Sequence, residues 1–198
     1  SPAPKSSVIA IEQQSLDNLG RWPWSREIHA KMIAQLRQGG AQLIVPTVFF
    51  TEPQRDRGLD FIEKLAQQIA ANPEAYPALL NDNVQVALQN LNVDRLLAEQ
   101  IGAAGNVLLP MMFSLGEQAG EATHELPEFV MRQEIEGSGD ATLGMPQSVI
   151  NPVLPIADIG ERAKGVASLN LDPDADGVVR RIPLALRYYD AIFPSFLT

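Results

Sequence analysis

Three short runs of consecutive apolar residues constrain the fold of this chain most strongly. They lie at residues 8–11, 43–50 and 107–109, and the second is interrupted by Pro46. Runs without alternation suit strands that are buried on both faces, as in a parallel sheet covered by helices. The sequence therefore predicts the α/β fold class.

The segments between these runs carry helical signals. Ser25 can cap a helix with one apolar face, and Gly39-Gly40 can end it. Strand, helix and strand at this spacing predict a parallel βαβ unit with a right-handed crossover. Residues 54–93 read as a mostly polar helical insertion, after which Asp94 can cap a further helix before a strand that ends at Pro110.

The second half of the chain is less regular. Residues 114–150 are acidic and rich in glycine, which predicts loops with one strand around residues 129–135. Residues 165–171 and 178–188 read as two strands joined by Pro-Asp and Asp-Gly turn residues. This pattern predicts a C-terminal antiparallel hairpin.

Together these segments predict one domain over residues 1–198. Its architecture is a mixed sheet with an N-terminal parallel βαβ unit, helices packed on the sheet and the C-terminal hairpin. Residues 193–198 resemble the start of a helix, because Pro and Ser favour helix starts. We therefore expect this chain to be a piece of a longer protein.

Composition excludes several classes of function. The formal charge is −9 and the pI is about 4.7, which argues against a nucleic-acid binder. The chain has no cysteine, so disulfides, thiolate catalysis and cysteine-ligated zinc are excluded. We predict no cofactor. Seven acids lie close together in the second half: Glu117, Glu121, Glu125, Glu128, Glu134, Glu136 and Asp140.

Enzyme motifs are missing from the sequence. It has no Gly-x-Ser-x-Gly nucleophile segment and no phosphate-binding glycine loop. His29 reads as a surface or capping residue and His124 as a solvated loop residue. One segment matches the first part of a calcium-binding loop, which has oxygen ligands at alternate positions: Asp172, Asp174 and Asp176. The match fails at the twelfth position, where Pro183 replaces the bidentate glutamate. We read them as an acidic turn and keep calcium as the weaker alternative.

Both tryptophans of the chain stand in one short segment between two arginines. Arg21, Trp22, Trp24 and Arg26 follow the first predicted strand and precede a helix. Ligands of open α/β folds bind at the carboxyl ends of strands, and aromatic faces with arginine suit an anionic or planar ligand. Large aromatic residues more often serve packing, so a rigid turn is the competing interpretation.

Several segments of the sequence form a recognisable series in a fixed order. Trp-Pro-Trp-x-Arg and Asp-Gly-Val-Val-Arg-Arg are the most specific of them, and the whole set is residues 8–16, 19–26 with His29, 52–53, 94–98, 107–110, 165–170, 174–181, 183–184 and 194–195. This series resembles the CHASE domain of type two (cyclase/histidine-kinase-associated sensory extracellular domain). The resemblance covers most of the chain but not residues 54–93 or 114–150.

The sequence departs from the family at two positions. The family usually has aspartate where Glu12 stands, and another aspartate near Thr47. Both positions fall near ends of predicted strands, so we include Glu12 and Thr47 among the candidate ligand-binding residues. A ligand that the family binds through this acidic pair would not suit this chain equally well.

The resemblance implies a sensor domain outside the cytoplasmic membrane of a bacterium. Transmembrane helices would flank it, and a cytoplasmic cyclase or kinase would supply the output. Its partner would be an unknown small molecule or a periplasmic protein, and the full-length protein would be a homodimer. One rival is a hydrolase-like enzyme that uses Glu12, Asp17 and arginines on a phosphorylated or anionic substrate. The other rival is an interaction module without a small ligand.

Overall fold

The protein is described here from a computed structural model. The described residues are 6–55, 57–120, 122, 125–135, 146–171, 176, 179 and 182–196. The helices are α1 (Gln13–Leu19), α2 (Arg26–Gln38), α3 (Arg57–Ala71), α4 (Ala78–Leu91), α5 (Val93–Ala104), α6 (Glu128–Met131) and α7 (Ala157–Gly160), with a 3₁₀ turn at Pro73–Ala75. The strands are β1 (Leu108–Leu115), β2 (Gln147–Val153), β3 (Gly165–Ser168), β4 (Ala185–Tyr188) and β5 (Ala191–Pro194).

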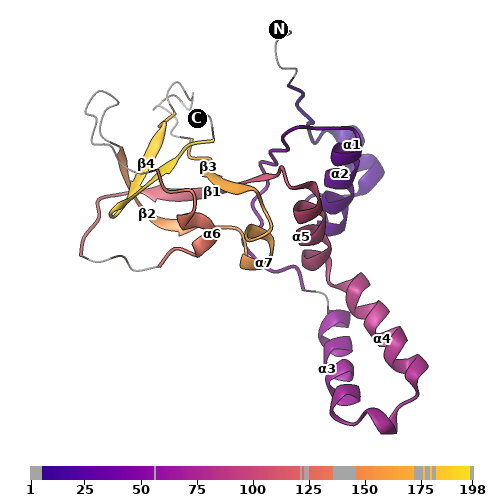
Figure 1. Ribbon diagram of the computed structural model, residues 1–198. Coiled ribbons are helices and arrows are strands. Elements are labelled where there is room, and N and C mark those ends of the chain that lie inside the picture. The colour runs from indigo at the N-terminus through magenta and orange to yellow at the C-terminus, as the bar shows by residue number, and fades with distance from the viewer. Residues whose placement is uncertain are drawn as a thin grey trace.

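The five strands form one mixed sheet in the order β3-β1-β2-β4-β5. The β1–β3 and β2–β4 pairs are parallel, whereas β1–β2 and β4–β5 are antiparallel. Figure 1 shows the sheet and α6 on one side, and α1, α2 and α5 on the other, with α7 between them. The mixed α/β class with helices and a C-terminal antiparallel hairpin is thus confirmed.

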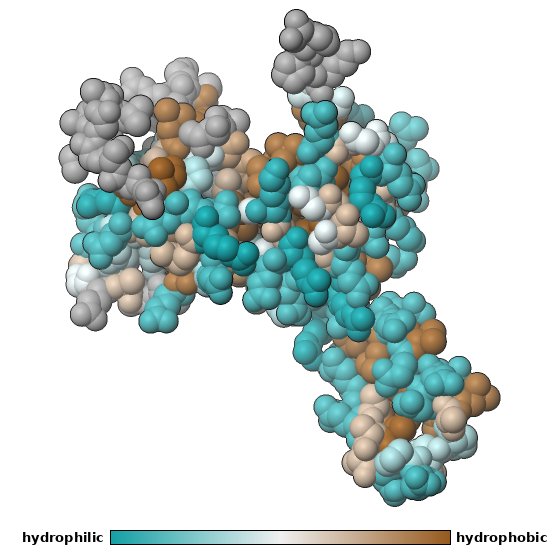
Figure 2. Space-filling model, in the orientation of Figure 1, coloured by the Kyte–Doolittle hydropathy of each residue, from teal (hydrophilic) through white to brown (hydrophobic). Residues whose placement is uncertain are grey.

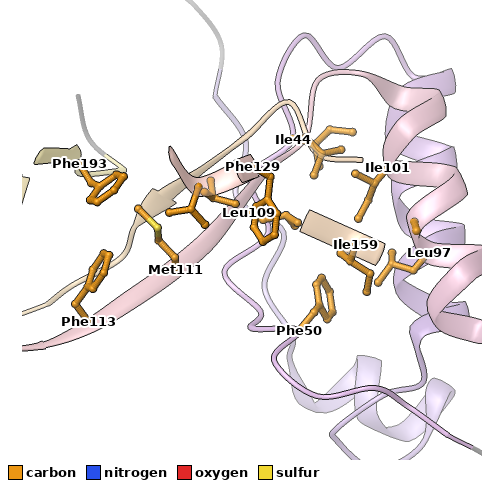
Figure 3. Close-up of a cluster of buried hydrophobic side chains, with 14 of the residues drawn as sticks. Ile44, Phe50, Leu97, Ile101, Leu109, Met111, Phe113, Phe129, Ile159 and Phe193 are labelled. Carbon is orange, nitrogen blue, oxygen red and sulfur yellow. The ribbon is translucent and has the colours of Figure 1, made fainter. Parts of the chain in front are cut away.

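The core is continuous from the helices to the sheet. Leu97 and Ile101 of α5 are fully buried, as is Ile159 of α7. Figure 3 shows this group close to Leu109, after which Met111 and Phe113 carry the core along β1 toward Phe193 of β5. The strand β1 therefore connects the packing of the helical side with that of the sheet.

The α3–α4 hairpin projects away from the rest of the molecule (Figure 1). The two helices pack on each other and α4 contacts α5. Several large apolar side chains of the hairpin stay exposed, among them Phe61, Leu79 and Val86, and Figure 2 shows brown patches there among hydrophilic surface. The helical content predicted for residues 54–93 is present, and Asn72-Pro73 separates the two helices.

The N-terminal unit agrees with the sequence prediction only in part. Residues 8–11 form no strand, and Val8 is 94% exposed. Of residues 43–50, only Ile44 makes a β-bridge, parallel to Val107. Pro46 lacks the N–H that a ladder needs, so this segment offers few hydrogen bonds to a neighbouring strand. The helix expected between the two runs, α2, is present with Ser25 at its N-cap.

The C-terminal hairpin is made by other strands than the sequence predicted, because the described residues among 165–171 and 178–188 do not pair with each other. β3 pairs in parallel with β1, and the antiparallel pair is β4–β5. Residues 191–194, which include the expected helix start, are strand β5. The connecting turn is Tyr189-Asp190, where Tyr189 has a φ of 53°. A tight hairpin requires such left-handed backbone, but tyrosine gives no sequence signal for it.

Two other predictions are wrong in detail. The strand expected around residues 129–135 is the short helix α6, although Ile135 N–H does donate to the Ile192 carbonyl at 2.8 Å. The strand expected to end at Pro110 continues to Leu115. Proline is tolerated there because neither neighbouring strand uses an N–H of Pro110. Val107 and Met111 face β3, accepting from Lys164 and Leu169 N–H, and β2 pairs with β1 only from Met112.

Buried Asn170 extends the β1–β3 pairing beyond the last residue of β3. Its Oδ1 accepts from Phe113 N–H at 3.0 Å, and its Nδ2 donates to the Phe113 carbonyl at 2.6 Å. Ser168 Oγ donates to the same Oδ1 at 2.9 Å. The side-chain amide thus satisfies both backbone groups of Phe113 as a neighbouring strand would.

Candidate functional site

Arg26 joins the start of α2 to two other parts of the chain. Its Nε lies 3.1 Å from Asp94 Oδ1, and its NH2 donates to the Glu52 carbonyl at 2.8 Å. The guanidinium also lies 4.6 Å from the centroid of the Phe50 ring. The Arg26 and Asp94 side chains are only 14% and 9% exposed, so water screens the pair weakly. The second arginine of the tryptophan segment is therefore a structural cross-link.

Asp94 completes this cross-link and does not cap α5. Its Oδ2 accepts from Gln54 N–H at 2.7 Å, while Gln54 Oε1 accepts from Arg26 N–H at 2.9 Å. The N-cap of α5 is Asn92, whose Oδ1 accepts from Arg95 N–H at 2.9 Å. Asp94 is thus wrongly predicted as a cap, and its carboxylate instead ties the chain near residue 54 to α2 and α5.

Four aromatic rings cluster beside this cross-link. The Trp22 ring lies 5.5 Å from Trp24 and 5.8 Å from His29, both edge-on, and His29 lies 5.3 Å from Phe50. These distances are typical of favourable edge-to-face aromatic pairs. The Trp22-Pro23 peptide bond is cis, and Trp24 Nε1 donates to the Gly20 carbonyl at 2.9 Å.

An open hollow of about 420 Å³ lies against this cluster. Its lining comes from the tryptophan segment, the start of α2, the segment before Phe50 and the end of the N-terminal segment. The lining residues are Ile11, Trp22, Pro23, Trp24, Arg26, His29, Thr47, Val48 and Phe49. Residues distant in sequence thus form one concave surface with both apolar and polar parts.

Four of the six candidate ligand-binding residues line this hollow: Trp22, Trp24, Arg26 and Thr47. Glu12 and Arg21 do not. Glu12 precedes α1 and is exposed, and its side chain makes no cap hydrogen bond there. The hollow therefore matches the aromatic part of the predicted site better than its charged part.

The sequence profile of the CHASE2 domain matches residues 2–198. The chain belongs to the CHASE2 family. This is a family of sensory extracellular domains and not of enzymes. No curated protein and no solved structure gives a significant match. None of the described helices is both long enough and apolar enough to cross a membrane.

The motifs that carry the resemblance have separate structural tasks in this CHASE2 domain. Trp22, Trp24 and Arg26 build the hollow, and Asp94 of the Asp-x-x-Leu-Ala segment fixes Arg26. The segment ending in Asn170 holds β3 to β1 at a distance from the hollow. The first two motifs therefore position the candidate site.

His29, like Asp94, has a place in this site that the sequence analysis did not foresee. It was expected at the surface or as a cap, but it is only 3% exposed, and its Nδ1 has no hydrogen-bond partner among the described residues. Burial and, secondarily, the charge of Arg26 lower the pKa of His29 from its usual 6.5, so the ring is neutral near pH 7. Its spacing from buried Ala30 and Ile33 on α2 was the signal available in the sequence.

The described residues hold no group of three side chains suited to a metal ion. Of the calcium alternative, Asp172 and Asp174 lie outside the described residues, and only Asp176 is described. His124 and part of the acidic stretch also lie outside them. Within the described part of that stretch, Glu128 lies 4.0 Å from Arg132 on the surface of α6.

Proposed function

We propose that this chain is the extracytoplasmic sensor domain of a bacterial inner-membrane receptor. In this proposal, flanking transmembrane helices pass the signal to a cytoplasmic cyclase or kinase domain. The observation that carries it is the match of a sensory extracellular family to residues 2–198.

The hollow beside Trp22 is the site at which a ligand would act. Ile11, from the N-terminal segment, lines it together with Thr47 and Phe49. A ligand that binds one arrangement of these segments better than another shifts the equilibrium toward that arrangement. In the receptor, the N-terminal segment would transmit this shift to the preceding membrane helix.

We also propose that the full-length receptor is a homodimer. Two copies supply two sets of membrane helices that can move relative to each other, which gives the cytoplasmic domains a change to detect. A periplasmic protein in place of a small ligand would use the same coupling.

A substitution that fills the hollow tests this function without knowledge of the ligand. Thr47→Phe adds a ring to the exposed lining, and Leu79→Ser on the α3–α4 hairpin serves as the control. Cyclase or kinase activity of the full-length protein in membranes should change for Thr47→Phe and stay unchanged for Leu79→Ser. Equal activity of the two variants and the parent would contradict the coupling.

A further inference from the structure

The chemistry of the hollow restricts the class of ligand that the proposed sensor domain can bind. We propose that the ligand is a small, uncharged aromatic molecule that carries a hydroxyl or amide group. This inference rests on the proposed function and adds the ligand class to it. Three properties of the lining support it: the state of its cation, its aromatic surface and an unpartnered buried histidine.

The cation in the lining is already neutralised. Arg26 donates through Nε to Asp94 and through NH2 to the Glu52 carbonyl. A carboxylate or phosphate ligand would have to compete with Asp94, which is almost fully buried at 3.1 Å from the guanidinium. Displacing it would leave a buried charge without its partner, which is costly. An anionic ligand is therefore disfavoured.

A cationic ligand is disfavoured because the lining offers it no carboxylate. Tryptophan faces attract cations, but a cation that leaves water also needs an opposite charge close by. None of the described lining residues is an aspartate or glutamate, and the nearby Asp94 is already paired with Arg26. An uncharged molecule avoids both penalties.

The exposed aromatic surface favours a planar ligand. Trp22 is 43% exposed although it lies beside Trp24 and His29, and its ring stands at 68° and 87° to theirs. Rings at such angles form a corner in which a further ring can pack edge-to-face or offset. A hollow of about 420 Å³ lies toward the small end of ligand sites, which limits the ligand to a small molecule.

His29 supplies the reason for a polar group on the ligand. His29 lines the hollow and is only 3% exposed. Its Nδ1 has no hydrogen-bond partner among the described residues. A buried polar nitrogen without a hydrogen bond is rare in folded proteins and costs stability. A neutral imidazole offers one donor and one acceptor, and the Thr47 hydroxyl offers both. The Thr47 hydroxyl is exposed in the lining and can pair with a ligand hydroxyl or amide directly, whereas His29 Nδ1 lies beneath the surface of the hollow and can pair only with a group that inserts between the rings.

Three probes with one ring and different charges test this assignment: benzyl alcohol, benzoate and benzylammonium. Both tryptophans of the chain line the hollow, so their fluorescence reports binding at this site. Benzyl alcohol should change the fluorescence at concentrations about tenfold lower than either charged probe. Trp22→Ala should abolish that response, whereas Leu79→Ser, far from the hollow on the α3–α4 hairpin, should retain it.

Equal or tighter binding of benzoate or benzylammonium would overturn the ligand class, as would no response to any probe. An undiminished response of Trp22→Ala, with its fold verified by circular dichroism, would overturn the site. The proposed function is tested separately by introducing Leu79→Cys into the full-length protein and labelling this thiol from outside the cell with a maleimide that cannot cross the membrane. A domain that is labelled from outside the cell but binds no neutral probe therefore refutes this inference alone.

Discussion

Replacing Arg26 by alanine separates a structural from a ligand-binding role of this arginine. The substitution removes the partner of Asp94 and the donor to the Glu52 carbonyl, and it leaves Phe50 without the covering guanidinium. If Arg26 instead served a ligand, its loss would cost the free domain little stability.

The expected cost follows from burial. Removing one partner of a buried ion pair destabilises a protein by about 3–5 kcal/mol, because the remaining charge stays buried and unpaired. The Arg26 and Asp94 side chains are 14% and 9% exposed, which places the pair in this class. For a domain of this size the loss corresponds to a drop in Tm of about 6–20 °C.

Thermal and urea unfolding followed by circular dichroism measure this effect. Arg21→Ala is the matched control, because Arg21 is exposed and its loss should change stability by less than about 0.5 kcal/mol. Arg26→Ala combined with Asp94→Ala should cost less than the sum of the two single changes. Equal Tm values for Arg21→Ala and Arg26→Ala would refute the structural role.

Three further predictions follow from other buried groups. Because the pKa of His29 is lowered in the folded protein, the unfolded chain binds more protons than the folded one below about pH 6.5, and the free energy of unfolding should fall as the pH drops below that value. His29→Phe should weaken this dependence, and an unchanged pH profile of the variant would contradict it. Asn170→Ala leaves the Phe113 N–H and carbonyl unsatisfied and should cost about 1–3 kcal/mol for each group in urea unfolding, so a loss under ~0.5 kcal/mol would count against the pairing. Gly160→Ala places a Cβ 2.5 Å from a ring carbon of Phe129 and should lower stability by about 1–3 kcal/mol, and an unchanged Tm would show that the ring moves freely.

Local signals in the sequence predicted α2 and the helices between residues 57 and 104, although the short helix α6 was predicted as a strand. Ser25 begins α2 through its side chain, which accepts from Glu27 N–H, and Gly39 follows its last residue. These features depend on residues next to one another in the chain, so the sequence contains what is needed to predict them.

Strand pairing was harder to predict because it depends on partners far apart in the chain. Residues 8–11 have the composition of a buried strand, yet they pair with no strand of the described chain. The β4–β5 hairpin turns at Tyr189, a residue whose positive φ no turn rule anticipates.

The candidate site shows the same division. The aromatic segment was predicted from Trp22 and Trp24, because both tryptophans and their arginines stand within a few residues. The roles of Asp94 and His29 were missed, since both arise from contacts with distant residues. A carboxylate near a helix start reads as a cap until the arginine that it binds is located.

The side of the membrane on which this domain lies decides whether it can be an extracytoplasmic sensor. The chain has no cysteine, and Leu79 on the α3–α4 hairpin is 70% exposed, so Leu79→Cys provides a single accessible thiol in it. The full-length protein, with any other cysteines replaced, is treated in intact spheroplasts with a maleimide that cannot cross the membrane. An extracytoplasmic domain is labelled at position 79 before lysis. Labelling only after lysis would place the domain in the cytoplasm and contradict the proposed receptor topology.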